Sequence, residues 1–85
     1  MGEVHRDEYQ ILVKRLRAER LKAGLSQTEV ARHLGKSQSY VTKIEISERR
    51  MDVVQLRDFC RVLGLDFVDF IREYDADVRR TLQDQ

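Results

Sequence analysis

The residues of this sequence that could do chemistry are amides, short hydroxyls and basic side chains between residues 26 and 50. Four of them follow one another at helical spacing, and they are Gln38, Ser39, Thr42 and Lys43. On a helix, such steps place the side chains on neighbouring exposed positions. Glutamine can pair bidentately with adenine and lysine with guanine, each pairing giving about 1–3 kcal/mol of discrimination between bases. The pattern predicts a helix face that reads base edges in the major groove of double-stranded DNA.

The sequence contains no pattern typical of a catalytic or metal-binding site. Its single cysteine, Cys60, cannot form an internal disulfide or a cysteine-based zinc site, and it stands on an apolar face typical of a core. His33 ends a short predicted helix and His5 falls in a leader, and neither has a recognisable nucleophile or carboxylate partner. A calcium loop of alternating oxygen ligands around a central glycine is also missing. We expect a protein that is not an enzyme and that needs no metal or cofactor.

The charge is unevenly distributed along the 85 residues, whose formal net charge is only +1. Residues 1–50 hold eleven Lys or Arg against seven Asp or Glu, a charge of +4, whereas residues 51–85 carry −3. The basic half contains the whole predicted base-reading unit, so the near-neutral total does not exclude DNA binding. A run of about 18 apolar residues and the apolar centre of a signal peptide are both missing, which predicts a cytoplasmic protein without a membrane partner.

Five helices are expected, over residues 8–23, 27–34, 38–46, 53–63 and 67–82. Gly24, Gly35 and Gly64 mark three helix ends, because glycine favours the left-handed position just past a helix. The residues able to cap the helices that follow are Ser26 with Glu29, Ser37 or Ser39, Asp52 with Gln55, and Asp66. Residues 41–46 could alternate as a short strand, but no second strand is predicted to pair with them. The fold class is therefore expected to be all-α.

Apolar residues recur at three- and four-residue steps along these helices, as on the core-facing side of a helix. They are Tyr9, Leu12, Leu16 and Leu21 in the first helix, Val30, Ala31 and Leu34 in the second, Val53, Leu56, Phe59, Cys60 and Leu63 in the fourth, and Phe67, Phe70, Ile71, Tyr74, Val78 and Leu82 in the fifth. Ala31 is small enough to let the second and third helices cross closely, and Gly35 permits a sharp turn between them. These two helices form a predicted helix-turn-helix.

At these residues the sequence resembles the XRE family, the Cro- and phage-repressor-like helix-turn-helix proteins. The matching residues are Leu16, Arg17, Arg20, Gly24 to Ala31, Leu34, Gly35, Ser37, Tyr40, Val41, Lys43 to Glu45, Arg49, Arg50 and Leu56 through Leu65. The resemblance implies a compact five-helix, lambda-repressor-like fold, with a DNA-binding domain at residues 8–66 after a flexible leader at 1–7. It also implies that the protein docks on its operator as a dimer.

The resemblance implies roles for single residues. Gln38, Ser39, Thr42 and Lys43 match base-reading positions, and Gln27 matches a glutamine that holds a DNA phosphate. Further phosphate contacts are expected from Lys36, Ser37, Tyr40, Arg49 and Arg50, while Arg17 is either another phosphate contact or a solvated charge. Arg20 and Glu45 match positions that form an internal ion pair between the first helix and the end of the recognition helix.

Two positions after the third helix depart from the family pattern. Ser47 stands where the family usually has a glycine, and Met51 where it usually has a proline. Serine is less comfortable than glycine in a left-handed turn, so we expect the third helix to run past Ile46 or to end in a different way. The reach of Arg49 and Arg50 toward the DNA backbone depends on this loop.

The resemblance fades beyond Leu65, where residues 67–85 form an extended carboxy-terminal helix that completes the core. We expect Tyr74, Val78 and Leu82, at its far end, to pack against a second copy, the alternatives being a frayed tail or a fold-back within the monomer. Two recognition helices about 34 Å apart would then read a palindromic site.

The preferred interpretation is a prokaryotic or phage transcriptional regulator of the bacterial nucleoid, a repressor acting as a homodimer on a palindromic operator. Two alternatives remain. One is an antitoxin whose acidic carboxy-terminal helix binds a basic toxin, and the other is a restriction–modification controller protein.

Overall fold

The structure, a computed structural model, describes residues 7–83, which form five helices and no strand. The helices are α1 (Asp7–Lys22), α2 (Gln27–Leu34), α3 (Gln38–Glu45), α4 (Val53–Leu63) and α5 (Phe67–Gln83). Their bounds confirm the all-α prediction and differ from the expected ones by a single residue at any end. The expected flexible leader lies outside the described residues except for Asp7, which begins α1. No helix in the described part of the chain is long and apolar enough to cross a membrane.

The helix boundaries follow from local capping chemistry. The Ser26 hydroxyl accepts from the backbone N–H of Glu29 while the Glu29 carboxylate accepts from the backbone N–H of Ser26, a reciprocal capping box. These hydrogen bonds hold the pKa of the Glu29 carboxyl below its ordinary value. Asp52 and Gln55 form the same arrangement at the start of α4. Gly35 ends α2 in the left-handed conformation, at a φ of 69°.

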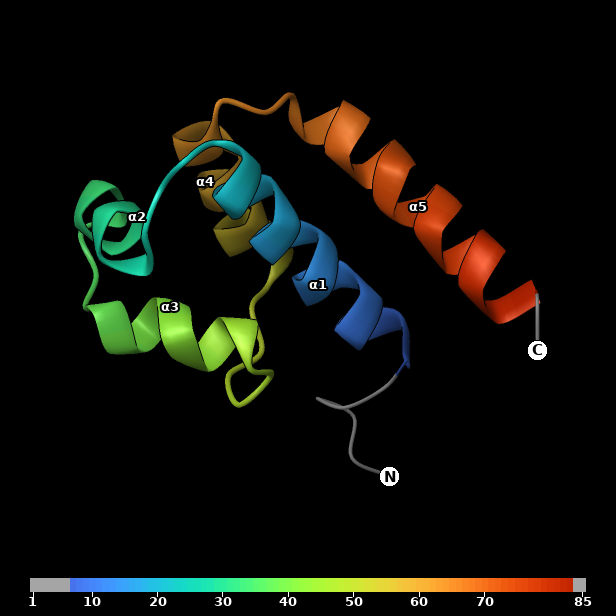
Figure 1. Ribbon diagram of the computed structural model, residues 1–85, viewed down its shortest axis with the longest axis horizontal. Coiled ribbons are helices and arrows are strands. Elements are labelled where there is room, and N and C mark those ends of the chain that lie inside the picture. Colours follow the sequence, from blue (N-terminus) through green and yellow to red (C-terminus); the bar gives the residue numbers. More distant parts are fainter. Residues whose placement is uncertain (1–6, 84–85) are drawn as a thin grey trace.

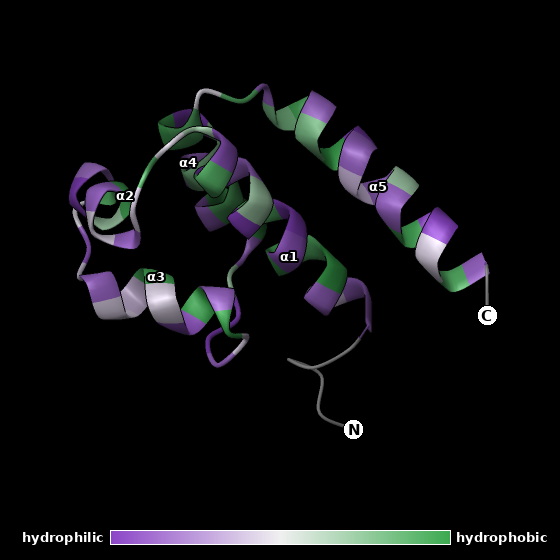
Figure 2. Cartoon of the chain, viewed as in Figure 1, coloured by the Kyte–Doolittle hydropathy of each residue, from purple (hydrophilic) through white to green (hydrophobic). Residues whose placement is uncertain are grey.

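The core lies among the five helices, with α5 along one side of α1, α3 on the other, and α2 packed against both α3 and α4 (Figure 1). Its buried apolar members are Tyr9, Val13, Leu16, Val30, Ala31, Val41, Ile44, Met51, Leu56, Phe59, Cys60, Leu63 and Phe70. Figure 2 shows the hydrophobic residues recurring between hydrophilic ones along each helix, which is the periodicity seen in the sequence.

Two residues expected in the core are exposed. Leu21 has 52% of its surface exposed, because the buried face of α1 advances from Leu16 to Arg20 and Leu21 lies one residue beyond it. Val53 is 62% exposed, because it stands in the first turn of α4 at the rim of an open groove.

The far half of α5 contacts α1 of the same chain. The Tyr74 hydroxyl donates to the Glu8 carbonyl at 3.1 Å, and its side chain packs against the core. Arg15 on α1 donates to both carboxylate oxygens of Asp77, at 2.7 and 3.2 Å. Tyr74 was expected to pack against a second copy; in the structure it contacts α1 of its own chain, because α5 runs antiparallel beside α1 and reaches its beginning (Figure 1).

Candidate nucleic-acid interface

Helix α3 presents a polar face that is anchored from behind by two completely buried residues. Val41 and Ile44 pack beneath the helix, against Val30 and Ala31 of α2 among others. Gln38, Ser39 and Lys43 are exposed on the opposite side, and Thr42 is half-buried at its edge. The Ser37 hydroxyl caps α3 by accepting from the backbone N–H of Tyr40 at 3.2 Å. The structure thus brings the four predicted base-reading residues onto one helix, three of them exposed.

The turn between α2 and α3 is closed by backbone hydrogen bonds. The N–H of Gly35 donates to the carbonyl of Arg32 at 3.1 Å, and the N–H of Lys36 donates to that of Ala31 at 2.9 Å. These bonds satisfy carbonyls at the end of α2 and fix the angle at which α3 leaves it. The predicted helix-turn-helix is therefore formed as expected.

Cationic side chains border the exposed face of α3 on the side of Tyr40. The Lys36 ammonium lies 5.3 Å and the Arg49 guanidinium 5.0 Å from the centre of the Tyr40 ring, and this ring stacks on Phe59. Burial raises the pKa of the Tyr40 hydroxyl, so it stays neutral. A neutral ring face attracts both cations. Tyr40 therefore gathers Lys36 and Arg49 into one positive site, from residues expected to contact phosphates.

The loop after α3 takes the left-handed turn in spite of its serine. Helix α3 ends at Glu45, one residue earlier than expected, and Ser47 has a φ of 64° with a side chain that is almost completely buried. The N–H groups of Glu48 and Arg49 then both donate to the Lys43 carbonyl, at 2.8 and 3.0 Å. The departure from the family pattern therefore changes the residue in the turn without abolishing the turn.

Tyr9 of α1 holds the same loop from inside, a role that sequence reasoning missed. Its hydroxyl accepts from the backbone N–H of Met51 at 3.1 Å and donates to the Arg49 carbonyl at 3.2 Å. A proline at position 51 would have no N–H to donate, so Met51 permits this contact. The Arg50 guanidinium lies 4.8 Å from the centre of the Tyr9 ring. One buried tyrosine thus positions the backbone that carries both predicted phosphate-binding arginines.

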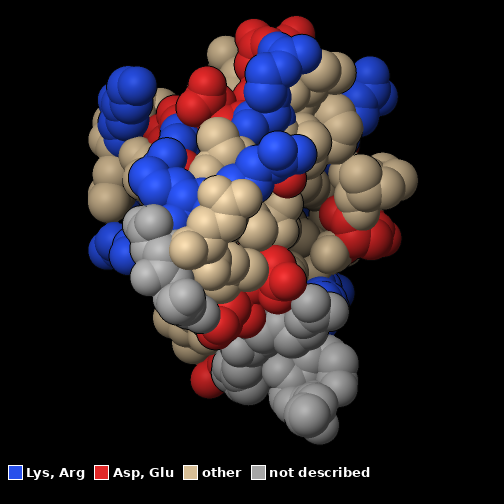
Figure 3. All heavy atoms as spheres, turned by 90° about the vertical axis from the view of Figure 1, so that its right-hand side faces the viewer, with Lys and Arg blue, Asp and Glu red and all other residues tan. Residues whose placement is uncertain are grey.

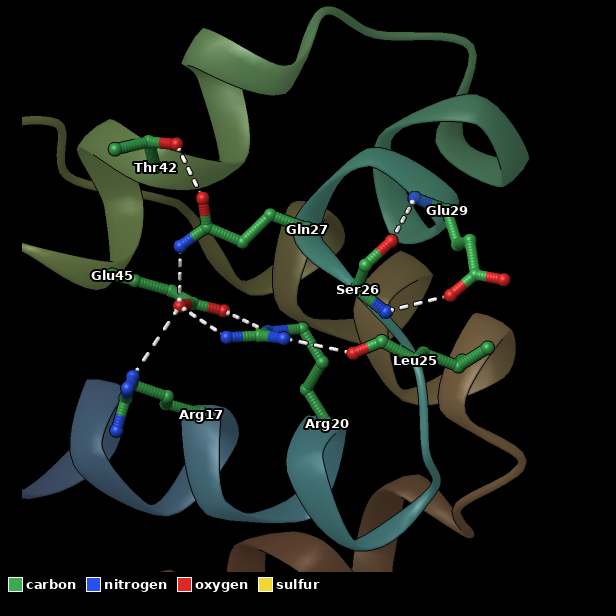
Figure 4. A network of polar contacts seen from close by, with 8 residues as sticks. All are labelled: Arg17, Arg20, Leu25, Ser26, Gln27, Glu29, Thr42 and Glu45. Atoms are coloured by element: carbon green, nitrogen blue, oxygen red, sulfur yellow. Dashed lines mark hydrogen bonds and ion pairs between the residues drawn. The ribbon is translucent and has the colours of Figure 1, made fainter.

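Arg20 and Glu45 form a bidentate ion pair between α1 and the end of α3 (Figure 4). The Arg20 Nε and Nη2 atoms donate to the two carboxylate oxygens of Glu45 at 2.6 and 3.0 Å, and its Nη1 donates to the Leu25 carbonyl at 2.8 Å. The side chains are 8% and 3% exposed, so the pair is almost fully buried. Arg17 approaches Glu45 at 3.8 Å from the solvent side and is itself exposed. This pair fixes the end of α3 to α1.

Gln27 and Thr42 join the same network. The Nε2 of Gln27 donates to Glu45 Oε1 at 2.9 Å, and the Thr42 hydroxyl donates to Gln27 Oε1 at 2.6 Å (Figure 4). The family resemblance implies that Gln27 contacts a phosphate and Thr42 a base. In the structure the two side chains bind each other. Both residues border the exposed face of α3, but each side chain is hydrogen-bonded to other side chains of the protein.

Cys60 lies in the core, as the sequence predicts. Cys60 is buried in α4, and burial raises the pKa of its thiol to about 11, so the thiol stays protonated. His33 is exposed near the end of α2, and His5 lies outside the described residues. Among residues 7–83, no group of three or more histidines, cysteines or carboxylates is arranged to hold a metal ion.

This geometry agrees with what the chain resembles. The family model of a helix-turn-helix domain matches residues 11–70. A solved structure described as an XRE-family like protein from Pseudomonas syringae pv. tomato str. DC3000 is 40% identical in sequence. The match has a TM-score of 0.81 and covers 87% of this chain and 90% of that chain. The chain belongs to the XRE family of helix-turn-helix proteins. No curated protein matches its sequence.

Membership of the XRE family has a direct functional meaning. The XRE helix-turn-helix is a DNA-binding fold of transcriptional regulators and not an enzyme fold. In this XRE protein the second helix of the helix-turn-helix is α3, and α2 packs against it. The chain is therefore a DNA-binding regulator.

Proposed function

We propose that this XRE protein is a repressor that binds a palindromic operator as a homodimer, with α3 of each copy in the major groove. The observation that supports this proposal most directly is the exposed face of Gln38, Ser39 and Lys43, bordered by the positive site around Tyr40. Such groups can reach base edges while the neighbouring cations contact the phosphates, which position the protein without reading sequence.

The size of the domain suits binding by two copies. It measures 38 × 28 × 21 Å, so two adjacent copies can hold their recognition helices about 34 Å apart, one turn of DNA. One α3 offers too few base contacts for an operator, and a second copy doubles them. A palindromic site with half-sites about one helical turn apart is the expected target.

We place the contact between copies at the far end of α5. Val78 and Leu82 are half-buried there, and Leu82 lines an open groove together with Ile11 and Lys14 of α1. Leu82→Asp should shift the protein from dimer to monomer in sedimentation equilibrium without unfolding it. Val54→Asp, which introduces the same charge at an exposed valine of α4, is the matched control and should leave the dimer intact. An unchanged dimer in the Leu82 variant would place the contact elsewhere.

The charges on α5 do not favour the alternative of a toxin-binding acidic helix. Its carboxylates are bridged by arginines of the same helix, at 3.1 Å from Arg72 to Asp69 and at 3.0 Å from Arg79 to Asp75. Figure 3 shows acidic and basic groups intermixed on the face of the molecule that it presents. A basic partner would have to compete with these arginines, so an extended acidic surface is not available on this helix.

The proposed function is tested by selecting bound duplexes from a random pool at several salt concentrations. A palindromic enriched site is expected, with an affinity that falls steeply with salt because each neutralised phosphate contributes about 0.9 to the logarithmic slope. Repression is tested separately, by placing the selected site across a promoter and measuring transcription with increasing protein. Enrichment of no sequence would contradict operator binding, and increased transcription would contradict repression.

A further inference from the structure

Thr42 differs from the other three predicted base-reading residues in where its hydroxyl points. Gln38, Ser39 and Lys43 are exposed, whereas Thr42 is half-buried and donates its only hydroxyl hydrogen to Gln27 Oε1 at 2.6 Å. This contact joins α3 to the first residue of α2 across the helix-turn-helix (Figure 4). To donate to a base edge, Thr42 would first have to break this bond.

The contact determines which way the Gln27 amide faces. Gln27 Nε2 donates to Glu45 Oε1 at 2.9 Å, while its Oε1 accepts from Thr42. A reversed amide would bring Gln27 Oε1 against the Glu45 carboxylate, and two acceptors repel each other. Glu45 cannot turn aside, because Arg20 binds both of its carboxylate oxygens. The network therefore admits one orientation of the Gln27 side chain.

This orientation suits the binding of an anion. A primary amide carries two N–H groups, and only one is donated to Glu45. Gln27 is the first residue of α2, where the helix dipole and the backbone N–H groups favour a negative charge. A phosphate oxygen at the start of α2 would meet an amide that already presents its donor side and loses little freedom on binding.

We propose that Thr42 is a positioning residue, which locks the Gln27 amide for a DNA phosphate rather than reading a base with its hydroxyl. The inference rests on the proposed DNA-binding function and gives the Thr42 side chain a positioning role in place of base reading. It also explains why Thr42 is half-buried while the other three predicted base-reading residues are exposed.

Two substitutions separate the hydroxyl of Thr42 from its methyl group. Thr42→Val keeps the shape and removes the hydroxyl, and it should weaken binding about three- to tenfold, the usual effect of losing one hydrogen bond. The loss should be equal for the selected operator and for a scrambled duplex, and the salt slope should not change because no charge is removed. Thr42→Ser keeps the hydroxyl and should bind within about twofold of the wild type.

A double-mutant cycle with Gln27→Ala identifies the group through which Thr42 acts. In the Gln27→Ala background, Thr42→Val should have no further effect, because the amide that it orients is gone. Lys36→Ala is the matched control for a charged phosphate contact: it should weaken all duplexes and also lower the salt slope by about 1.

The outcomes that overturn the positioning role are distinct from those that overturn DNA binding. If the effect of Thr42→Val is confined to one base position and persists without Gln27, then Thr42 reads that base. If Thr42→Val leaves the affinity unchanged, or if Thr42→Ser weakens binding as much, the hydroxyl does not position Gln27. If the wild-type protein bound no duplex, both the proposed function and the positioning role of Thr42 would be contradicted.

Discussion

Ser47 offers a test of how this chain takes the turn that a glycine would usually make. Its φ of 64° is left-handed, which costs an L-residue with a Cβ about 1–2 kcal/mol. Its hydroxyl is buried with only 1% of the residue exposed, and it has no hydrogen-bond partner among residues 7–83, which costs about another 1–3 kcal/mol. Both penalties belong to the folded state alone.

Ser47→Gly removes both penalties. Glycine stabilises the unfolded chain by about 0.5–1 kcal/mol through its greater backbone entropy. The loss of the packing of the serine side chain offsets part of the remaining gain in stability. We expect a net gain of about 1 kcal/mol in the free energy of unfolding, or roughly 4–8 °C in the thermal midpoint for a domain of this size. Thermal and urea unfolding followed by circular dichroism measure it.

Two further variants at the same position separate the contributions. Ser47→Ala keeps the left-handed strain and removes only the hydroxyl, so its stability should lie between those of the wild type and Ser47→Gly. Ser47→Val adds a β-branched side chain at a positive φ and should be less stable than the wild type. A Ser47→Gly midpoint equal to or below that of the wild type would refute the reasoning, since neither strain nor an unpaired hydroxyl would then destabilise the fold.

Three other predictions concern contacts that hold the domain together. Arg20→Ala leaves Glu45 buried without its bidentate partner and should cost about 3–5 kcal/mol in urea unfolding, whereas Arg17→Ala, at the exposed edge of the same network, should cost under about 1 kcal/mol. Tyr9→Phe leaves the backbone N–H of Met51 without its partner, so we expect a loss of about 1–3 kcal/mol in stability and weaker DNA binding in a fluorescence anisotropy titration. The hydrogen bond from Arg15 holds the pKa of Asp77 below its ordinary value, so this carboxylate stabilises the fold above about pH 4 and stops doing so as the pH falls through its lowered pKa. The difference in thermal midpoint between the wild type and Asp77→Asn should accordingly be present at pH 7 and vanish in acid.

The helices could be predicted from the sequence because their ends depend on neighbouring residues. Ser26 and Glu29 cap each other within one helical turn, and Gly35 adopts the left-handed conformation that ends α2. The exposed residues of α3 were predictable for the same reason, since Ser39 and Lys43, four residues apart, share a face once the helix is placed. Such capping interactions involve residues close in sequence, so they can be predicted without knowing any tertiary contact.

The differences between expectation and structure concern residues whose surroundings are set by distant parts of the chain. Leu21 is exposed because Arg20, normally a surface residue, turns inward to meet Glu45, which is 25 residues away. Tyr74 packs on its own α1 because α5 runs back along that helix. Spacing within one helix cannot reveal such partners.

The same limit explains why the roles of Tyr9 and Thr42 were not predicted. The hydroxyl of Tyr9 reaches a backbone N–H 42 residues away, and Thr42 meets Gln27 only because α2 and α3 cross at a fixed angle. In both cases the sequence contains the chemical group, but only the fold selects its partner.

Sequence-specific reading by α3 is tested most directly by one affinity ratio. The dissociation constant for the selected operator is compared with that for a scrambled duplex of equal length and composition, at physiological salt. We predict binding at least about a thousandfold tighter to the operator, and Lys43→Ala should reduce this ratio by relaxing the preference at one base position. Equal affinity for the two duplexes, or a ratio that Lys43→Ala leaves unchanged, would contradict base recognition by this face of α3.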